Sequence, residues 1–128
     1  QSEYNAKAAL VAAAQMYEKC AISMSGELPP EARVAIPQAA NDLLTIQGVE
    51  ASFVAVQVGS GVNISARSLG AVNVQLIMES LGGGGHQTMA AAQMRHITPE
   101  AAVSRLRSAI DTYRASQRKD SVTQGTKA

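Results

Sequence analysis

The chain has 128 residues, of which 46% are hydrophobic, 16% are charged and only 3% are aromatic, and its formal net charge is +1. This length suits one domain with an aliphatic core, and the near-neutral charge gives no general attraction to nucleic acid or to a membrane surface. The single cysteine, Cys20, excludes an intramolecular disulfide, and no stretch reaches the roughly 18 apolar residues of a membrane helix. Because the sequence starts at Gln1 without a signal-peptide pattern, we expect it to be a piece of a longer protein.

The first fifty residues or so show one long helical pattern and then shorter ones. Small and apolar residues recur at three- and four-residue spacing up to Tyr17, which predicts an amphipathic helix. Its role is open between an element of this domain and a linker from a preceding one. Alternating residues after it predict short strands, and Pro37 is typical of a helix start. In order, we expect a linker helix at 1–19, strands at 20–24 and 33–36, and a helix at 37–47 that Gly48 ends.

The strongest strand signal is a hairpin near the middle of the chain. Residues 51–58 are apolar on both faces, as in an interior strand, and the glycine-rich turn 59–61 connects them to an alternating run. Because successive side chains of a strand point to opposite faces, Asn63, Ser65 and Arg67 share one polar face. Two explanations remain open: a solvated strand face, which is the more common of the two, or a ligand-binding face.

Four consecutive glycines, Gly82–Gly85, follow a short helix that Asn73 is expected to cap. Ordering them costs on the order of 2–4 kcal/mol relative to alanine. We therefore expect either a ligand that approaches the backbone closely or a mobile loop. Since the run follows a helix C-terminus, whose carbonyl end repels anions, a bound phosphate would need loop N–H groups and side chains such as Arg67 and His86.

The remaining residues predict one more strand, a final helix and a tail. The strand is expected at 89–94, and the helix begins at Thr98 and buries a stripe that reaches Tyr113. The polar stretch 116–128 predicts a disordered tail, which leaves 20–115 as the folded domain. Together these elements predict an α/β (α+β) fold, with helices packed on a mixed sheet of about five strands.

Familiar catalytic motifs are absent from the sequence. The glycine run lacks the Lys and Ser/Thr of a phosphate-binding P-loop, and it lacks the spacing of a dinucleotide fingerprint. The aspartates and the two histidines, His86 and His96, are not in metal-ligand spacing, and Cys20 has no evident base. We therefore expect no catalytic residue and no metal ligand in this chain, which leaves a binding half-site.

Two motifs resemble a known family. The run 62–68, followed after a short helix by 82–90, resembles the C-terminal, DHH-associated domain of the DHH phosphodiesterase superfamily. The stretches 28–40 and 48–53 are similar to the membrane-tethered cyclic-di-AMP phosphodiesterases of Gram-positive bacteria. The similarity covers most of the chain and departs from the family pattern at Ala91, where relatives often have glycine.

The resemblance implies a mechanism divided between two domains. In the family, an N-terminal DHH domain holds two Mn²⁺ ions that activate water against a phosphodiester, and the associated domain grips the nucleotide. Arg67 would pair with a substrate phosphate, because its planar guanidinium suits bidentate contact, and His86 would donate to phosphate or base. The substrate-binding residues implied in this way are Ser65, Arg67, Ser68, Gly82, Gly83, Gly84, Gly85, His86, Gln87 and Thr88.

The activity implied for the parent protein is hydrolysis of cyclic-di-AMP to linear pApA, with this chain alone inactive. The implied partners are a cyclic or short adenine dinucleotide and the N-terminal DHH domain. The parent would be anchored in the cell membrane, with this domain at the cytoplasmic face, through segments outside this chain, and a homodimer stays open. The alternative is a single-stranded nucleic-acid binding module, as in exonucleases and alanyl-tRNA synthetases, and the neutral charge and few aromatics count against it.

Overall fold

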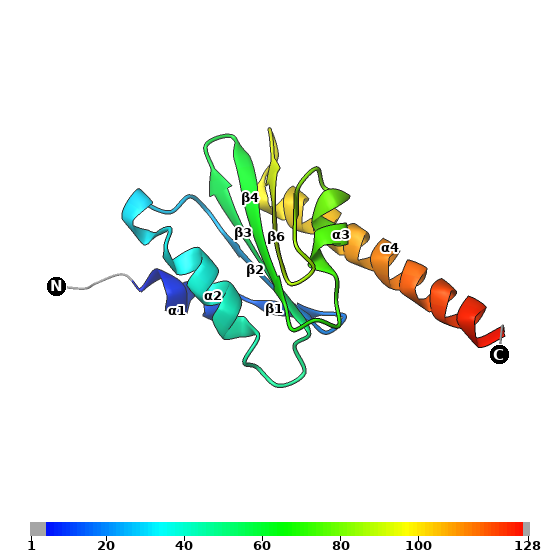
Figure 1. The fold of residues 1–128 in the computed structure, drawn as a ribbon. Helices are drawn as coiled ribbons and strands as arrows, with labels where there is room; N and C mark the ends of the chain where they lie inside the picture. The colour runs from blue at the N-terminus through cyan, green and yellow to red at the C-terminus, as the bar shows by residue number, and fades with distance from the viewer. Residues whose placement is uncertain (1–4, 127–128) are drawn as a thin grey trace.

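A six-stranded sheet with helices on both faces forms the domain (Figure 1), which confirms the predicted mixed α and β architecture. The computed structural model describes residues 5–126. In chain order the elements are α1 (Ala6–Ala12), β1 (Gln15–Tyr17), β2 (Cys20–Ser25), the 3-10 helix η1 (Pro30–Ala32), α2 (Ala35–Leu43), β3 (Ala51–Val58), β4 (Gly61–Ser68), α3 (Val74–Glu79), β5 (Gly84–Gly85), β6 (Met89–Met94) and α4 (Pro99–Thr126). None of the helices within this range combines the length and apolar character that crossing a bilayer requires.

The strand order is β1-β2-β3-β4-β6-β5, so β3 and β4 lie at the centre. β2 pairs with β3 in parallel, and every other pair is antiparallel. Residues 51–56 of β3 are buried, as expected for an interior strand covered on both faces. The predicted hairpin is confirmed, and its two-residue connection places Gly59 at a φ of +59°, a left-handed conformation that glycine adopts without strain.

The sheet separates two hydrophobic cores. One lies under α3 and α4, and its fully buried members include Phe53, Ile64, Leu106 and Ile110. The other lies under α1 and α2, and its fully buried members include Leu43, Val54 and Val56.

Two buried serines connect α1 and α2 to the sheet by hydrogen bonds. Ser23 Oγ on β2 donates to the Leu10 carbonyl of α1 at 2.5 Å, and Ser52 Oγ on β3 donates to the Ala40 carbonyl of α2 at 2.6 Å. These helices therefore cover β2 and β3, whereas the alternate residues of β6 on the same face stay exposed. One half of this sheet face is left open.

The predicted linker helix at 1–19 is wrong beyond Ala12. Residues 1–4 lie outside the described range, and Gln15–Tyr17 forms the edge strand β1. Glu18 and Lys19 adopt left-handed φ values of 51° and 65°, and they close a tight turn that pairs β1 with β2. The Tyr17 hydroxyl also lies 2.7 and 2.8 Å from the carboxylate oxygens of Asp111 on α4, so the edge strand contacts this helix.

The predicted strand at 33–36 is also wrong, because η1 and the start of α2 occupy this stretch. The helix begins at Ala35, two residues earlier than expected, and Pro37 lies in its first turn. A proline is tolerated there because the first N–H groups of a helix have no intrahelical acceptor.

A disordered tail from residue 116 is expected, but α4 continues to Thr126, and only 127–128 lie outside the described range. The far end of α4 projects beyond the sheet in Figure 1. Once the packed first half of a helix has formed, each further residue adds a hydrogen bond without a new nucleation cost. An apolar stripe is therefore not required for the helix to extend.

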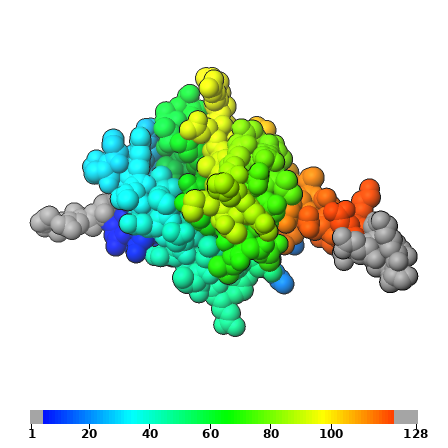
Figure 2. All heavy atoms as spheres, viewed as in Figure 1, coloured from blue at the N-terminus to red at the C-terminus, as the bar shows by residue number. Residues whose placement is uncertain are grey.

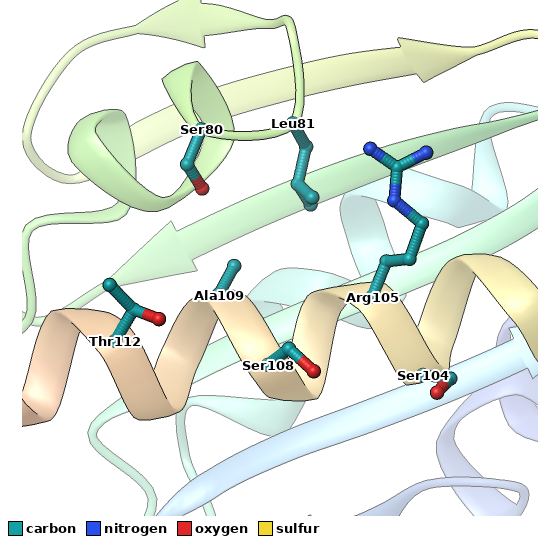
Figure 3. A pocket seen from close by; sticks show the side chains of 7 residues that line it. All are labelled: Ser80, Leu81, Ser104, Arg105, Ser108, Ala109 and Thr112. Atoms are coloured by element: carbon teal, nitrogen blue, oxygen red, sulfur yellow. The ribbon is translucent and has the colours of Figure 1, made fainter.

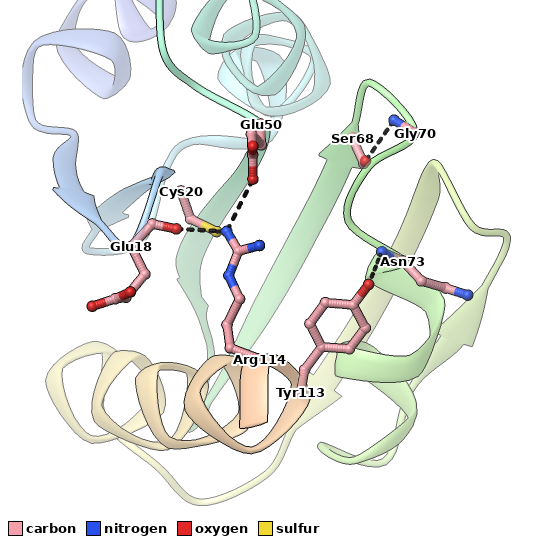
Figure 4. Close-up of polar contacts among 8 residues, drawn as sticks. All are labelled: Glu18, Cys20, Glu50, Ser68, Gly70, Asn73, Tyr113 and Arg114. Atoms are coloured by element: carbon pink, nitrogen blue, oxygen red, sulfur yellow. Dashed lines mark hydrogen bonds and ion pairs between the residues drawn. The ribbon is translucent and has the colours of Figure 1, made fainter. Parts of the chain in front are cut away.

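Two adjacent residues of α4, Tyr113 and Arg114, form hydrogen bonds to separate parts of the fold (Figure 4). The Arg114 guanidinium donates to the Glu18 carbonyl at 2.6 Å and to Glu50 Oε1 at 3.2 Å, next to the buried Cys20. Burial raises the pKa of the Cys20 thiol, which keeps it protonated. On the other side, the Tyr113 hydroxyl accepts a hydrogen bond from the Asn73 N–H at 2.9 Å and so fixes the start of α3.

We expect Tyr113→Phe to lower the free energy of unfolding by about 1–2 kcal/mol, since it leaves the Asn73 N–H without its acceptor. Urea denaturation followed by circular dichroism measures this change. Tyr17→Phe is the matched control, because its hydrogen bond to Asp111 is solvent-exposed, and it should cost less. An equal loss in the two variants would contradict a structural role for the Tyr113 hydroxyl.

Candidate functional site

The open half of the sheet face carries the polar residues that the sequence places on one side of a strand. Burial alternates along β4, with Val62, Ile64 and Ala66 buried, and this confirms the predicted alternation. The antiparallel register brings three rows of side chains onto the open face: Arg67 beside Met89, Ser65 beside Ala91 and Gly84, and Asn63 beside Gln93. We refer to these seven residues as the β4–β6 strip.

Arg67 is the cation of this strip, and it is incompletely paired. Its Nη1 donates to the neighbouring Ala66 carbonyl at 3.0 Å, while its Nε is buried without a hydrogen-bond partner among residues 5–126. The ion pairs of the described residues involve Lys7, Arg33 and Arg114 instead. Burial lowers the pKa of Arg67 from its ordinary value. A buried donor without an acceptor is costly, so this arrangement favours an anionic ligand.

A turn next to Arg67 presents free backbone N–H groups. His86 and Met89 close the turn with reciprocal bonds of 2.7 and 3.3 Å. The carbonyls of Gln87 and Thr88 accept from Val74 N and Ser68 N, each at 3.0 Å, whereas their own N–H groups bond to no described residue. Two consecutive N–H groups without acceptors among the described residues suit an anion.

Two residues of the implied substrate set brace this turn. The buried Ser68 hydroxyl accepts from the Gly70 N–H at 2.9 Å (Figure 4), and Gln87 Nε2 donates to the Gly70 carbonyl at 3.1 Å. Because successive side chains of β4 point to opposite faces, the side chain of Ser68 lies on the sheet face opposite to Ser65 and Arg67. The structure brings Ser65, Arg67 and Gly84 together on the strip and places the exposed His86 and Thr88 at its end.

The four glycines have different surroundings. Gly82 has a φ of +88° just after α3, and the Gly83 N–H donates to the Met78 carbonyl at 2.8 Å, so both complete the predicted helix end. A Cβ on Gly83 would clash with the Ala91 carbonyl, and one on Gly85 would lie 2.5 Å from the Ala90 Cα. Only Gly84 combines a backbone free of positive φ with open space at its Cβ position, in the row of Ser65.

Sequence reasoning did not include Met89 and Gln93 in the site. Both alternate with buried residues along β6, and this alternation is visible in the sequence 89–94. Which face they share with β4 depends on the strand register, which has no local sequence signal. In Figure 2 the yellow-green segment around the glycines and the cyan surface of α2 lie on the same visible face.

The described residues also line several cavities, two of which lie near the elements of the implied site. One, of about 310 Å³, lies between α3 and α4 and is lined by Arg105 and by hydroxyl side chains such as Ser80 and Ser108 (Figure 3). It is on the sheet face opposite to the strip. The second, of about 350 Å³, lies at the end of the strip near Asn63 and Gln93.

Metal-ligating side chains do not cluster within the part of the chain that the structure describes. No group of three or more His, Cys, Asp or Glu side chains lies close enough together there to hold an ion. The polar groups on the strip and in its adjacent turn are a guanidinium, a hydroxyl, two side-chain amides and backbone N–H groups.

Comparison with known proteins identifies relatives of this chain. A family model described as "DHHA1 domain" matches residues 30–116. The chain is 54% identical over 94 residues to the cyclic-di-AMP phosphodiesterase GdpP of Geobacillus thermodenitrificans. The aligned stretch covers 73% of this chain and 14% of that protein. It is 42% identical over 112 residues to the cyclic-di-AMP phosphodiesterase PdeA of Listeria monocytogenes, covering 86% of this chain and 17% of that protein.

A solved structure of an exopolyphosphatase-related protein from Bacteroides fragilis shares the fold. Its TM-score is 0.69 at 21% sequence identity, over 88% of this chain and 36% of that one. The chain thus spans less than a fifth of the length of the two curated relatives and about a third of this structural neighbour.

We expect alanine substitutions to separate the roles of the glycines. Gly83→Ala and Gly85→Ala should each lower the free energy of unfolding by about 1–3 kcal/mol, because the new methyl group meets the backbone of β6. Gly84→Ala should change it by less than about 0.5 kcal/mol, since its Cβ would meet open space. Chemical denaturation measures all three, and equal losses would contradict this division.

Proposed function

Because the chain belongs to the DHHA1 domain family, we propose that it is the substrate-binding domain of a cyclic-di-AMP phosphodiesterase. Two relatives at 54% and 42% identity are cyclic-di-AMP phosphodiesterases, and their similarity supports this substrate. The observation that carries the proposal is the buried Nε of Arg67, which has no hydrogen-bond partner among residues 5–126 and belongs to a residue paired with Met89, at the edge of the turn that holds two free N–H groups.

Arg67 and the turn hold one phosphate of the dinucleotide. The guanidinium supplies the charge and the buried Nε donor, and the N–H groups of Gln87 and Thr88 add uncharged donors. Ser65 lies one row away on the same face, where its hydroxyl contacts the sugar or the phosphate. Gly84, with no side chain, lets the ligand lie against the backbone of β5.

His86, Ser68 and Gln87 complete the site in two ways. The exposed imidazole of His86 donates to a phosphate or base edge from the end of the strip. Ser68 and Gln87 act as positioning residues, because they hold Gly70 and thereby the turn that carries the free N–H groups. Gly82, Gly83 and Gly85 shape the same segment.

Cleavage of the phosphodiester is performed by a separate DHH domain of the parent protein. Two Mn²⁺ ions in that domain would supply an activated water, and this chain alone is inactive. The residues described here bind the substrate and orient it toward that domain. Further segments of the parent anchor it in the membrane, with this domain at the cytoplasmic face.

In the parent protein we expect Arg67→Ala to lower kcat/KM for cyclic-di-AMP about 10- to 100-fold, the effect of losing a charge-assisted hydrogen bond. His86→Ala should lose most of the turnover as well. Mn²⁺-dependent release of linear dinucleotide measures both effects. Arg105→Ala is the matched control, because Arg105 is exposed and lies in the cavity between α3 and α4.

Unchanged turnover in both Arg67→Ala and His86→Ala would contradict the site. Titration of the parent with cyclic-di-AMP and with a single-stranded oligonucleotide distinguishes the alternative function. A strong preference for the oligonucleotide would favour a nucleic-acid binding module instead.

A further inference from the structure

Asn63 and Gln93 lie directly opposite one another on β4 and β6, one row beyond Ser65 on the side away from Arg67. Opposed side chains of an antiparallel pair have Cβ atoms roughly 4.5–5.5 Å apart, so both amides can contact one planar group. Asn63 is half-buried and Gln93 is exposed. The two amides therefore form a polar pair at the far end of the strip.

Neither of these amides is used within the part of the chain that the structure describes. Other amides have structural hydrogen bonds there: Gln57 donates to the Gly59 carbonyl, and Gln75 donates to Glu79. No such bond joins the side chains of Asn63 or Gln93 to residues 5–126. Their donors and acceptors are thus available to a ligand.

The amide pair lines a cavity of about 350 Å³, which lies within the range of roughly 300–1,000 Å³ typical of small-ligand pockets. Val58, on the same sheet face as Asn63, contributes to its lining, and the exposed Arg95 and His96 also line it. Such a cavity has room for a nucleobase, with apolar contacts for the ring and amides for its polar edge.

The stretch between this cavity and Arg67 is built from small residues. Ser65, Ala91 and Gly84 occupy the intervening row. Arg67 and Asn63 are four residues apart on one strand, which corresponds to about 13 Å at the usual strand rise. An extended nucleotide can therefore lie along the strip, with its phosphate at Arg67 and its base at the amides.

A primary amide places one donor beside one acceptor, which is complementary to the N6 amine and N7 of adenine. Guanine presents two acceptors on the corresponding edge and is matched by arginine or lysine. We propose that Asn63 and Gln93 read an adenine base and give the strip its base preference. This inference rests on the proposed function, in which Arg67 holds the phosphate of the same ligand.

The test compares binding of cyclic-di-AMP with that of cyclic-di-IMP, in which a carbonyl replaces the adenine amine. Calorimetric titration of the parent protein without Mn²⁺ prevents turnover. The wild type should bind cyclic-di-AMP about 10- to 100-fold more tightly. Asn63→Ala with Gln93→Ala should bring the ratio of the two affinities close to one, and Gln93→Ala alone, at an exposed position, should reduce it. Arg67→Ala should weaken both ligands and preserve the ratio.

Gln47→Ala, at an exposed position between α2 and β3, is the control and should leave both affinities unchanged. A wild-type ratio near one, or a double variant that keeps the wild-type ratio, would overturn the base-reading pair and leave the phosphate site intact. Failure of the wild type to bind either dinucleotide, or an Arg67→Ala variant with unchanged affinity, would overturn the proposed function and this inference with it.

Discussion

The antiparallel register between β4 and β6 is the constraint on which the rest of the site depends. It aligns Arg67 with Met89, and the hydrogen bond from Ser68 N to the Thr88 carbonyl continues the same pairing into the turn. A slip of one residue would move Arg67 into the core under α3 and α4 and bring Ala66 to the open face. The buried alternate positions of both strands therefore hold the polar positions in place.

Helix coverage explains why this face is accessible. α4 spans the other face and fixes the loop before α3 through Tyr113, and the Val74 N–H at the start of α3 then holds the Gln87 carbonyl. α1 and α2 cover β2 and β3 and reach β4, held by the buried hydroxyls of Ser23 and Ser52, and they leave the alternate residues of β6 exposed. A continuous hydrogen-bonded path thus connects α4 to the turn beside Arg67, while the strip itself stays open. The helix-covered face of the sheet therefore positions the turn, and the uncovered face carries the proposed binding residues.

Local patterns predicted much of this fold and part of the site. The alternation of 62–68 indicated the polar face, and Asn73 indicated the start of α3, where its Oδ1 accepts from Leu76 N at 3.3 Å. The strand β1 was missed because its pairing with β2 requires left-handed φ values at Glu18 and Lys19, which are unusual for residues other than glycine. The bracing role of Ser68 and the packing of Gly83 against β6 depend on tertiary contacts, for which neighbouring residues carry no signal.

The most direct measurement is an NMR titration of the ¹⁵N-labelled chain with the linear adenine dinucleotide pApA, since chemical shifts report even weak binding residue by residue. Phosphate held by Arg67 and the adjacent turn predicts changes at the Arg67 Nε–H and at the backbone N–H groups of Gly84, Gln87 and Thr88. Changes confined to the cavity between α3 and α4, or none at saturating dinucleotide, would contradict a binding site on the β4–β6 strip.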